Sequence, residues 1–592
     1  MMSFFKTFFA CLLAIGVLIF IGFILIGSAL MSDSKSTPSL EANTILNLTL
    51  KGEITDRAYS NPFRNLSPMA ALTGSVSDAS TIGLFELKEV LNQAKTDDHI
   101  KGVYLNLDEV VASPATMFEL KNALEDFKTS KKIIYAYSNQ MPEINLMLNT
   151  VADKFYMNPV GGAEFDGFAM QMEYYKNLMD KLGVEFKVFY VGEYKSATEG
   201  YRRSDMSPED RAQRTELLND ISTNFLNAVN KNTKIAVDTL SNWQNNLSIM
   251  NANDMLSHKL IAGLKYNDEV LEEIKTKLGY KKDADLNLIS YNDYNEIIKL
   301  KTTSSSDNSI AVVYAEGEIL DNNSDDGIIG GEAYVKLLQK IANDKNIKGL
   351  VLRVNSPGGS AFASEQIYHQ IEKIKTKMPV VVSMGDYAAS GGYYIAANAD
   401  KIIAEPNTIT GSIGIFGMVP DIRKALNEKV GVTFDEVKTA EHANFFSTIN
   451  NWDNLELDKV QKEVEHGYGI FLDRVSKGRK MDTSAVNKIA RGRVWTGQDA
   501  LGIGLVDELG NLDLAIKRVK ELAKIKEASI VTYPESKSMM ESILNGLMGD
   551  EESQESKMMK NLTPQLIFFK QLEHIQATGI YQYKIPYNIS VK

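Results

Sequence analysis

The chain has very little cysteine and histidine. Cys11 is the single cysteine among 592 residues, which excludes an intrachain disulfide and a cysteine-rich zinc site. The six histidines include no HExxH pair and no dense cluster with acidic residues. We therefore expect neither a metal nor another cofactor.

A long basic run is missing as well. The net charge is −12 at pH 7, with 64 lysines and arginines against 76 acidic residues. Nucleic acid is therefore excluded as the main partner, because binding it requires clustered lysine and arginine to neutralise the phosphates. The remaining composition, 44% hydrophobic and 24% charged, is typical of a globular protein.

One long apolar run stands at the N-terminus. Residues 7–30 contain no charged side chain. A helix of this length can span a bilayer core of about 30 Å, whereas a cleavable signal peptide has an apolar stretch of only about 7–15 residues. We therefore expect a retained transmembrane anchor within residues 1–30. Lys6 precedes the run and acidic Asp33 follows it, which favours a cytoplasmic N-terminus and a chain that otherwise lies beyond the membrane.

The rest of the chain contains one pattern twice. Ile-Lys-Gly at residues 100–102 recurs at 347–349, and Ala-Asp-Lys at 152–154 recurs at 399–401. Both pairs are offset by 247 positions, so the sequence between them aligns without a gap. The pattern indicates a duplicated domain.

Polar segments separate the two copies from their surroundings. In chain order we expect a Ser-rich tether, a first domain, a linker, a second domain and a tail, over residues 31–44, 45–300, 301–309, 310–535 and 536–592. The tail is interpreted as a docking helix, a membrane-surface contact or a disordered segment, and its sequence does not distinguish among them.

Each copy alternates strands and helices. Apolar runs rich in β-branched residues predict strands at 309–314, 349–354 and 379–383, and helical spacing of isoleucines predicts a helix at 364–377. The first copy repeats the order. Alternating βα units predict an α/β fold with a mostly parallel sheet that is buried on both faces.

Ser390 is a candidate nucleophile. It follows a predicted strand, begins a predicted helix at 390–398 and lies between small residues, Ala388, Ala389, Gly391 and Gly392. A hydroxyl at a strand–turn–helix junction meets the unpaired amides at the start of the helix. A serine there also serves as an ordinary helix cap, and its position alone does not decide between the two roles.

A glycine-rich loop is expected beside Ser390. Residues 355–360, Asn-Ser-Pro-Gly-Gly-Ser, follow a central predicted strand. Loops at the carboxyl ends of parallel strands gather at one edge of the sheet, and the amides of Gly358 and Gly359 could form an oxyanion hole there. The first copy has Val111 and Ala112 in place of these glycines, and Glu143 in place of the serine. An ordinary Pro-Gly turn is the alternative.

A serine nucleophile needs a base, and no His/Asp pair is suitably placed. Lys195 follows an apolar stretch at 188–194, and desolvation there would lower the pKa of its amine from about 10.4. Ser–Lys pairs are a known variant of the catalytic triad. A surface lysine with a buried stem remains the alternative.

Together these residues resemble signal peptide peptidase A in its long, membrane-anchored form, peptidase family S49. The matching stretches are residues 194–197, 355–360, 388–394, 411–414, 492–497 and 504–507. The resemblance implies tandem ClpP/crotonase-like domains and a serine endopeptidase that degrades cleaved remnant signal peptides. It also implies a homotetramer on the outer face of a bacterial inner membrane, with one membrane span and the bulk of the chain in the periplasm.

The same resemblance implies roles for single residues. Ser390 is the expected nucleophile, Lys195 the general base, and Gly358 and Gly359 the oxyanion loop. The expected substrates are apolar peptides. Two other functions stay open: a crotonase-like acyl-CoA enzyme, which a CoA-binding assay would reveal, and a non-catalytic membrane scaffold, which a serine-directed probe would leave unlabelled.

Overall fold

The computed structural model describes residues 39–58, 81–281, 283–301, 308–321, 327–535 and 581–584. The expected anchor at residues 7–30 lies outside this part of the chain. Within it, no helix has the length and apolar character needed to cross a membrane. The domain boundaries given above remain predictions; below, "first half" means the described residues up to 301 and "second half" those from 308 onward.

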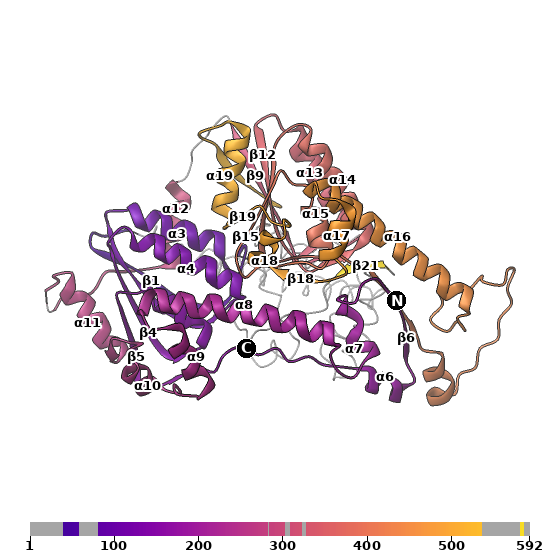
Figure 1. Cartoon of the computed structure of the whole chain (residues 1–592). Coiled ribbons are helices and arrows are strands. Elements are labelled where there is room, and N and C mark those ends of the chain that lie inside the picture. The colour runs from indigo at the N-terminus through magenta and orange to yellow at the C-terminus, as the bar shows by residue number, and fades with distance from the viewer. Residues whose placement is uncertain are drawn as a thin grey trace, which may run out of the picture.

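The first half contains a 7-stranded sheet (Figure 1). Its centre is formed by parallel strands β1 (Thr44–Thr55), β3 (Ile100–Val111), β4 (Ile133–Met141) and β5 (Lys154–Ala163). Helices α3 (Leu84–Thr96) and α4 (Pro114–Lys128) bury leucines against it. The apolar core is therefore continuous from sheet to helices.

The second half contains an 8-stranded sheet. Its central strands, β9 (Ser309–Glu316), β12 (Ile347–Ser356) and β14 (Val380–Ala389), are parallel and almost completely buried. Helices α13 (Gly331–Asn343) and α14 (Ala361–Lys375) pack on this sheet. Strands buried on both faces require near-continuous apolar sequence, which is what these segments carry.

The duplication is visible element by element. α13 and α14 begin and end 247 positions after α3 and α4, and β15 (Lys401–Ala404) begins 247 positions after β5. α8 (Pro208–Thr233) and α16 (Asn454–Arg479) each have 26 residues. The two halves are thus two copies of one βα arrangement.

A third sheet joins the halves. It has the strand order β11-β10-β13-β21-β17-β6. Its members are β6 (Glu185–Tyr190), β10 (Glu318–Leu320), β11 (Ile328–Gly330), β13 (Gly358–Ser360), β17 (Phe416–Asp421) and β21 (Tyr581–Lys584). Antiparallel pairing of β6 with β17 brings a first-half strand into the second half.

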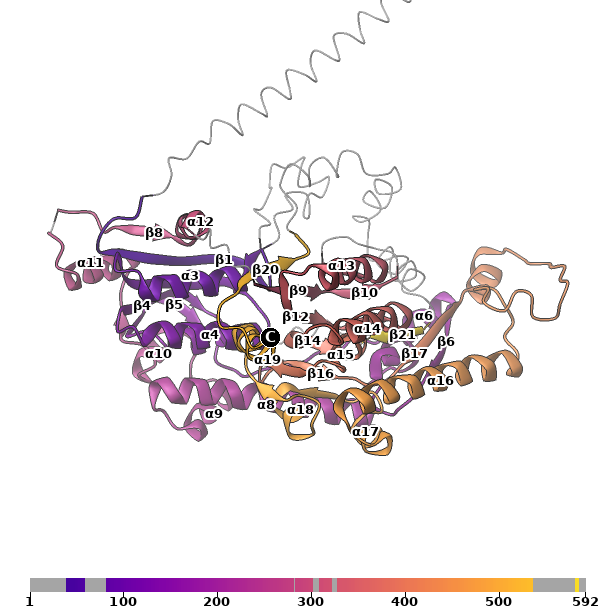
Figure 2. The same ribbon diagram turned by 90° about the horizontal axis from the view of Figure 1, so that it is seen from above.

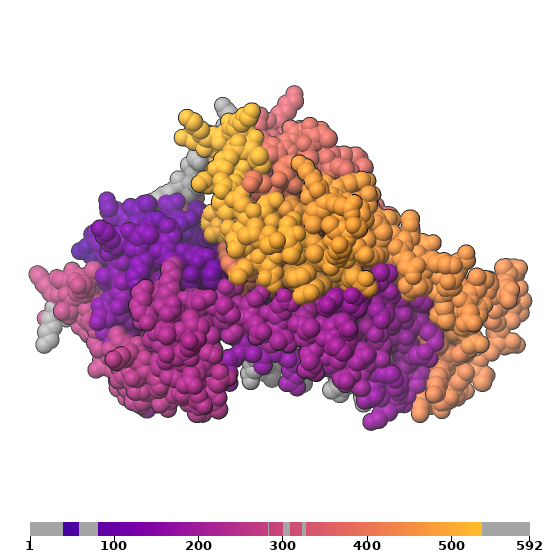
Figure 3. Space-filling view, in the orientation of Figure 1, coloured from indigo at the N-terminus to yellow at the C-terminus, as the bar shows by residue number. Residues whose placement is uncertain are grey.

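Helix α8 also connects the halves. Figure 1 shows it running from the first half to a position beneath the second half, and Figure 3 shows a continuous band under the second half. The Asn224 amide donates to Asn407 at 2.7 Å, and the Thr496 hydroxyl donates to Asp220 at 2.8 Å. Helix α8 itself is thereby held against the second half.

The remaining elements are further strands of the two large sheets and the shorter helices and turns of each half. In the first half they are β2 (Ile82–Gly83), η1 (Glu143–Asn145), α5 (Leu146–Asn149), α6 (Lys176–Leu182), η2 (Ser196–Thr198), α7 (Glu199–Arg202), α9 (Val237–Asn245), α10 (Ala252–Ser257), β7 (Gly263–Leu264), α11 (Asn267–Lys277), β8 (Leu288–Ser290) and α12 (Tyr291–Lys301). In the second half they are α15 (Gly391–Ala396), β16 (Ile409–Gly411), η3 (Ala425–Val430), α17 (Thr483–Ile489), β18 (Val494–Thr496), α18 (Gly497–Gly502), β19 (Glu508–Leu509), α19 (Leu512–Ala523) and β20 (Ser529–Tyr533).

Candidate active site

Ser390 stands at the turn between β14 and α15, fully buried. Its backbone has φ 57° and ψ −116°, a strained conformation for a residue with a side chain. Hydrogen bonds hold it on both sides: its N–H donates to the Gly411 carbonyl, and its carbonyl accepts from Tyr394, each at 2.8 Å. The Ser390 side chain makes no capping hydrogen bond to α15. The simple helix-cap interpretation therefore fails.

The Ser390 side chain meets Lys195 instead. Lys195 Nζ lies 2.8 Å from Ser390 Oγ, although the two residues come from different halves. Only 1% of Lys195 is exposed, and this burial lowers the pKa of its amine well below the ordinary value. The interpretation of Lys195 as a surface lysine is wrong.

Ser412 completes the surroundings of the amine. Lys195 Nζ lies 3.1 Å from Ser412 Oγ and 3.2 Å from the Ser412 carbonyl oxygen. A neutral amine has two N–H groups and one lone pair. If both N–H groups point to Ser412, the lone pair faces the hydroxyl of Ser390. The stretch 411–414 carries part of the family resemblance, but the sequence alone assigns no role to Ser412, because its contact with Lys195 depends on a fold that joins both halves.

Lys195 is positioned by elements of both halves. β6 leads into its turn, and the Tyr194 N–H donates to the Arg491 carbonyl at 3.1 Å. From α8, Gln213 donates to the Tyr194 carbonyl at 3.3 Å and accepts from the Val494 N–H at 3.3 Å. Gly492 has φ 83°, and a Cβ there would lie 2.5 Å from Lys195 N. Lys195 therefore packs against a turn of the second half in which residue 492 must be glycine.

The glycine loop lies beside this pair. A Cβ on Gly392, at the start of α15, would be 2.6 Å from the Ser356 carbonyl oxygen, so the loop after β12 lies against the turn at Ser390. Gly358 and Gly359 have φ 102° and 152°, and a Cβ on Gly359 would be 2.0 Å from the Ile319 carbonyl oxygen. Both positions therefore require glycine. The Gly358 N–H donates to Ser356 Oγ at 3.2 Å.

The sequence also matches known proteins. The pattern described as "Peptidase family S49" matches residues 126–281 and 372–526, more than half of the chain, and the "Clp protease" pattern matches residues 308–429. The chain belongs to peptidase family S49. It is 35% identical to "Protease 4" of Haemophilus influenzae, with 87% of this chain and 85% of that protein covered.

Two further relatives cover most of this S49 peptidase. "Protease 4" of Salmonella typhi is 34% identical over 90% of this chain and 87% of its own length. "Serine protease SPPA, chloroplastic" of Arabidopsis thaliana is 29% identical over 85% of this chain and 73% of its own length. The protein is therefore a serine protease, and the α/β fold of tandem ClpP-like domains is confirmed. This activity rules out the two alternatives, a non-catalytic membrane scaffold and a crotonase-like acyl-CoA enzyme.

The first half of this S49 peptidase has a different group at the position of the serine. Glu143, which aligns with Ser390, is buried and accepts hydrogen bonds from the N–H groups of Asp166 and Gly167 at 2.9 and 2.7 Å. Burial raises the pKa of this carboxyl. The Glu143 side chain is therefore engaged by neighbouring amides, and we assign it a structural role.

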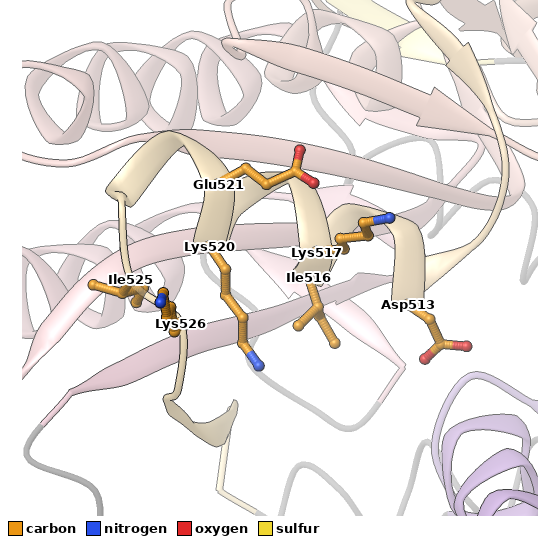
Figure 4. A pocket seen from close by; sticks show the side chains of 7 residues that line it. All are labelled: Asp513, Ile516, Lys517, Lys520, Glu521, Ile525 and Lys526. Atoms are coloured by element: carbon orange, nitrogen blue, oxygen red, sulfur yellow. The ribbon is translucent and has the colours of Figure 1, made fainter.

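Two other features of the S49 peptidase do not form a competing site. A surface pocket on α19, lined by Asp513, Lys517 and Lys520 among others, contains no serine (Figure 4). His442, Asp453 and Glu456 are close enough to hold an ion. However, Asp453 and Glu456 form the capping box of α16, which accounts for their arrangement without a ligand.

Replacement of Gly492 by alanine is expected to lower kcat about 100-fold, because the new Cβ would displace the backbone of Lys195. Gly504→Ala is the matched control: Gly504 has a similar φ of 81°, but a Cβ there would meet only Met481 Sδ, at 3.8 Å. Peptidase assays and circular dichroism of both variants check the prediction. Equal loss in the two variants would assign the effect to backbone strain alone.

Proposed function

We propose that this S49 peptidase is a membrane-anchored endopeptidase that degrades cleaved remnant signal peptides with Ser390 as nucleophile and Lys195 as general base. The observation that carries the proposal is the 2.8 Å approach of Lys195 Nζ to Ser390 Oγ in a fully buried setting. Burial lowers the pKa of the amine and so shifts it toward the neutral form, and only a neutral amine can accept the serine proton.

The reaction follows from this contact. As Ser390 Oγ attacks the peptide carbonyl carbon, Lys195 Nζ takes the hydroxyl proton. The tetrahedral intermediate then collapses, the C–N bond breaks, and Lys195 returns the proton to the departing amine. Water next attacks the acyl ester with Lys195 again as base, and Ser390 is regenerated. Ser412 orients the amine at every stage.

The negative oxygen of the tetrahedral intermediate needs N–H donors. The Gly358 N–H is already used within its loop, so we assign the Gly359 N–H to the oxyanion, together with the N–H of Gly391, which follows the nucleophile at the start of α15. Preorganised backbone amides cost no rearrangement when the charge develops. The strained backbone at Ser390 and the positive φ angles of Gly358 and Gly359 orient these amides toward the oxyanion in this proposal.

The location of the protein restricts its substrates. We propose that residues 7–30 anchor the chain in a bacterial inner membrane, that residues 31–44 form the tether, and that the domains at 45–300 and 310–535 lie on the periplasmic side. A site held close to the bilayer meets apolar peptides as they leave it. We further propose a homotetramer, as the family resemblance implies.

Covalent labelling tests the proposal directly. A fluorophosphonate probe should modify Ser390 of the full-length protein in detergent, as identified by peptide mass spectrometry. Ser412 provides an internal control, because it is equally buried and also contacts Lys195 but has no helix-start amides beside it. Labelling should disappear in Lys195→Met. Absence of label on Ser390, or equal label on Ser412, would contradict the assignment.

A further inference from the structure

The strand that leads to Ser390 departs from regular pairing shortly before the nucleophile. The parallel ladder between β12 and β14 runs to Val354 and Met384, and it resumes two residues later on β12 but four residues later on β14. β14 therefore has three residues, 385–387, opposite Asn355 alone. Bulges of this kind leave backbone groups without ladder partners and are frequent next to active sites, where they re-aim a side chain. This bulge ends three residues before the nucleophile.

Side chains replace the missing ladder contacts at the bulge. Asn355 Oδ1 accepts the Tyr387 N–H at 3.0 Å, and the Thr408 hydroxyl donates to the Gly385 carbonyl oxygen at 2.7 Å. Asn355 is also the first residue of the glycine loop, residues 355–360. Its side chain therefore connects the proposed oxyanion loop to the strand that carries the nucleophile.

Asp386, the middle residue of the bulge, links this arrangement to the first half. Its two carboxylate oxygens accept the N–H and the hydroxyl of Thr116, each at 2.9 Å, and Oδ2 also accepts from Asn355 Nδ2 at 3.4 Å. Thr116 lies in the first turn of α4, where Ser113 forms no side-chain cap. The carboxylate of Asp386 thus acts as an N-cap from the other half, at the positive end of the helix dipole. Figure 2 shows α4 at the side of the first half that faces the second half.

The Asp386 carboxyl keeps its charge under ordinary assay conditions. Desolvation, and then the charge of Asp56, raise its pKa to about 6, although the hydrogen bonds from Thr116 oppose this shift. The group is therefore mainly ionised at pH 8. Arg353 supplies a cation to the same strand by donating to Ser383 Oγ at 2.9 Å. Hydrogen bonds to an ionised acceptor are roughly twice as strong as those between neutral groups, so Asp386 is a firm attachment point.

The first copy of the domain supports its bulge without this link. Asp108 aligns with Asn355 at the offset of 247, and its carboxylate accepts the N–H of Gln140 at 3.3 Å, the equivalent backbone contact. Asp386 aligns with Asn139, whose side-chain oxygen accepts hydrogen bonds from its own half. The link across the halves thus belongs to the copy with the nucleophile. An amide at position 355 fits it, because a carboxylate there would repel Asp386.

We propose that Asp386 is a positioning residue for hydrolysis, which joins Thr116 to Asn355 and so keeps the glycine loop and the turn at Ser390 in register. This inference rests on the proposed function. The nucleophile and the proposed oxyanion amide follow directly from β14 and β12, whose pairing is irregular at this point. A misplacement of about 1 Å between such groups costs up to about 100-fold in rate. The link therefore controls turnover and not peptide binding.

An exchange of charge between two side chains tests the link. Asn355→Asp keeps an acceptor for the Tyr387 N–H, as Asp108 does in the first copy, but sets a carboxylate against Asp386. In the full-length protein at pH 8 we expect this variant to lower kcat for a fluorogenic apolar peptide about tenfold, with KM unchanged. Asp386→Asn should have a similar effect, because one amide oxygen must then serve two N–H groups. The double variant Asn355→Asp/Asp386→Asn restores donor and acceptor and should recover kcat to within about threefold of the wild-type value.

A second measurement separates positioning from general damage to the site. A peptide boronic acid, which mimics the tetrahedral intermediate, should bind Asn355→Asp about tenfold more weakly, whereas a cleaved product peptide should bind equally well to variant and wild type. Equal weakening of both ligands would assign the loss to peptide binding and overturn the inference. Asp108→Asn is the matched control, because it changes the aligned side chain in the first copy, and its kcat should stay at the wild-type value.

The outcomes separate this inference from the proposed function. If kcat is unchanged in Asn355→Asp and Asp386→Asn while Ser390→Ala is inactive, the positioning role is overturned and the Ser–Lys assignment stands. If the single variants do not fold, the double variant decides: a folded, active protein supports the link, and an unfolded or slow one overturns it. If Ser390→Ala retains full activity, the proposed function itself fails and the inference falls with it.

Discussion

Lys195→Met is expected to lower kcat for peptide hydrolysis about 10⁴-fold, which is the upper range for losing a general base. Methionine fills a similar volume and suits a site in which only 1% of the lysine is exposed, so folding should be preserved. In the proposed mechanism, the Ser390 hydroxyl would then lack the base that takes its proton. Steady-state assays of the full-length protein, with circular dichroism as the folding control, measure the effect.

A second substitution distinguishes chemistry from damage to the fold. Ser390→Ala should lose a comparable factor, and the double variant Ser390→Ala/Lys195→Met should be no slower than either single variant, because residues that act as one unit are not additive. Multiplicative losses in the double variant would mean that the two residues act separately and would refute the dyad.

The dependence of activity on pH follows from the burial of Lys195. Burial lowers the pKa of the amine in the folded protein, and the proposed mechanism requires its neutral form. The kcat/KM value should therefore fall as the pH drops through this lowered pKa, with a slope that corresponds to one proton, and it should be on a plateau well below pH 10.5. A profile that still rises at pH 10 would show that the amine is charged in the free enzyme.

The sequence predicted much of this architecture because the duplication constrained it. Apolar β-branched runs and isoleucine spacing placed β9, β12 and α14 within three residues of their observed ends, whereas β14 continues to Ala389, six residues past the predicted end at residue 383. The helix after Ser390 is shorter than expected, ending at Ala396 rather than Asn398. The exact ends of helices depend on hydrogen bonds that the hydrophobic pattern of the sequence does not encode.

Contacts between distant segments could not be predicted. Pairing of β6 with β17, which brings Lys195 to Ser390, joins residues more than 200 positions apart. None of the three interpretations of the tail included a strand, although residues 581–584 form one, because a strand that completes another sheet is stable only in that context. The pairings of β6 and of β21 depend on which strand edges the rest of the fold leaves open.

A buried charge network also connects the halves. Arg353 on β12 of the second half donates to Asp56 of the first half at 2.8 and 3.0 Å and to Glu119 at 3.1 Å. Lys88 reaches Glu119 at 2.6 Å. Burial alone would raise the pKa of the Glu119 carboxyl, but the two cations hold it below its usual range. These charges are mutually dependent, since each is removed from water.

Arg353→Met is therefore expected to destabilise the protein by about 3–5 kcal/mol, because Asp56 and Glu119 would keep buried charges without this cation. Urea unfolding followed by tryptophan fluorescence measures the change. Lys336→Met is the control: Lys336 pairs with Glu332 at 2.6 Å, but both side chains are about two-thirds exposed or more, and its unfolding midpoint should not move.

The pH response identifies the cause of the Arg353 effect. In the wild-type protein the lowered pKa of Glu119 contributes stability that is present above the ordinary carboxyl pKa and is lost as the pH falls through the folded value. In Arg353→Met, Glu119 keeps only Lys88 of its two buried cations, so its pKa should be lowered less and the deficit of the variant should narrow as the pH falls from about 4.5 to about 2. A deficit that stays constant over this range would assign the loss to packing and not to the unpaired carboxylate.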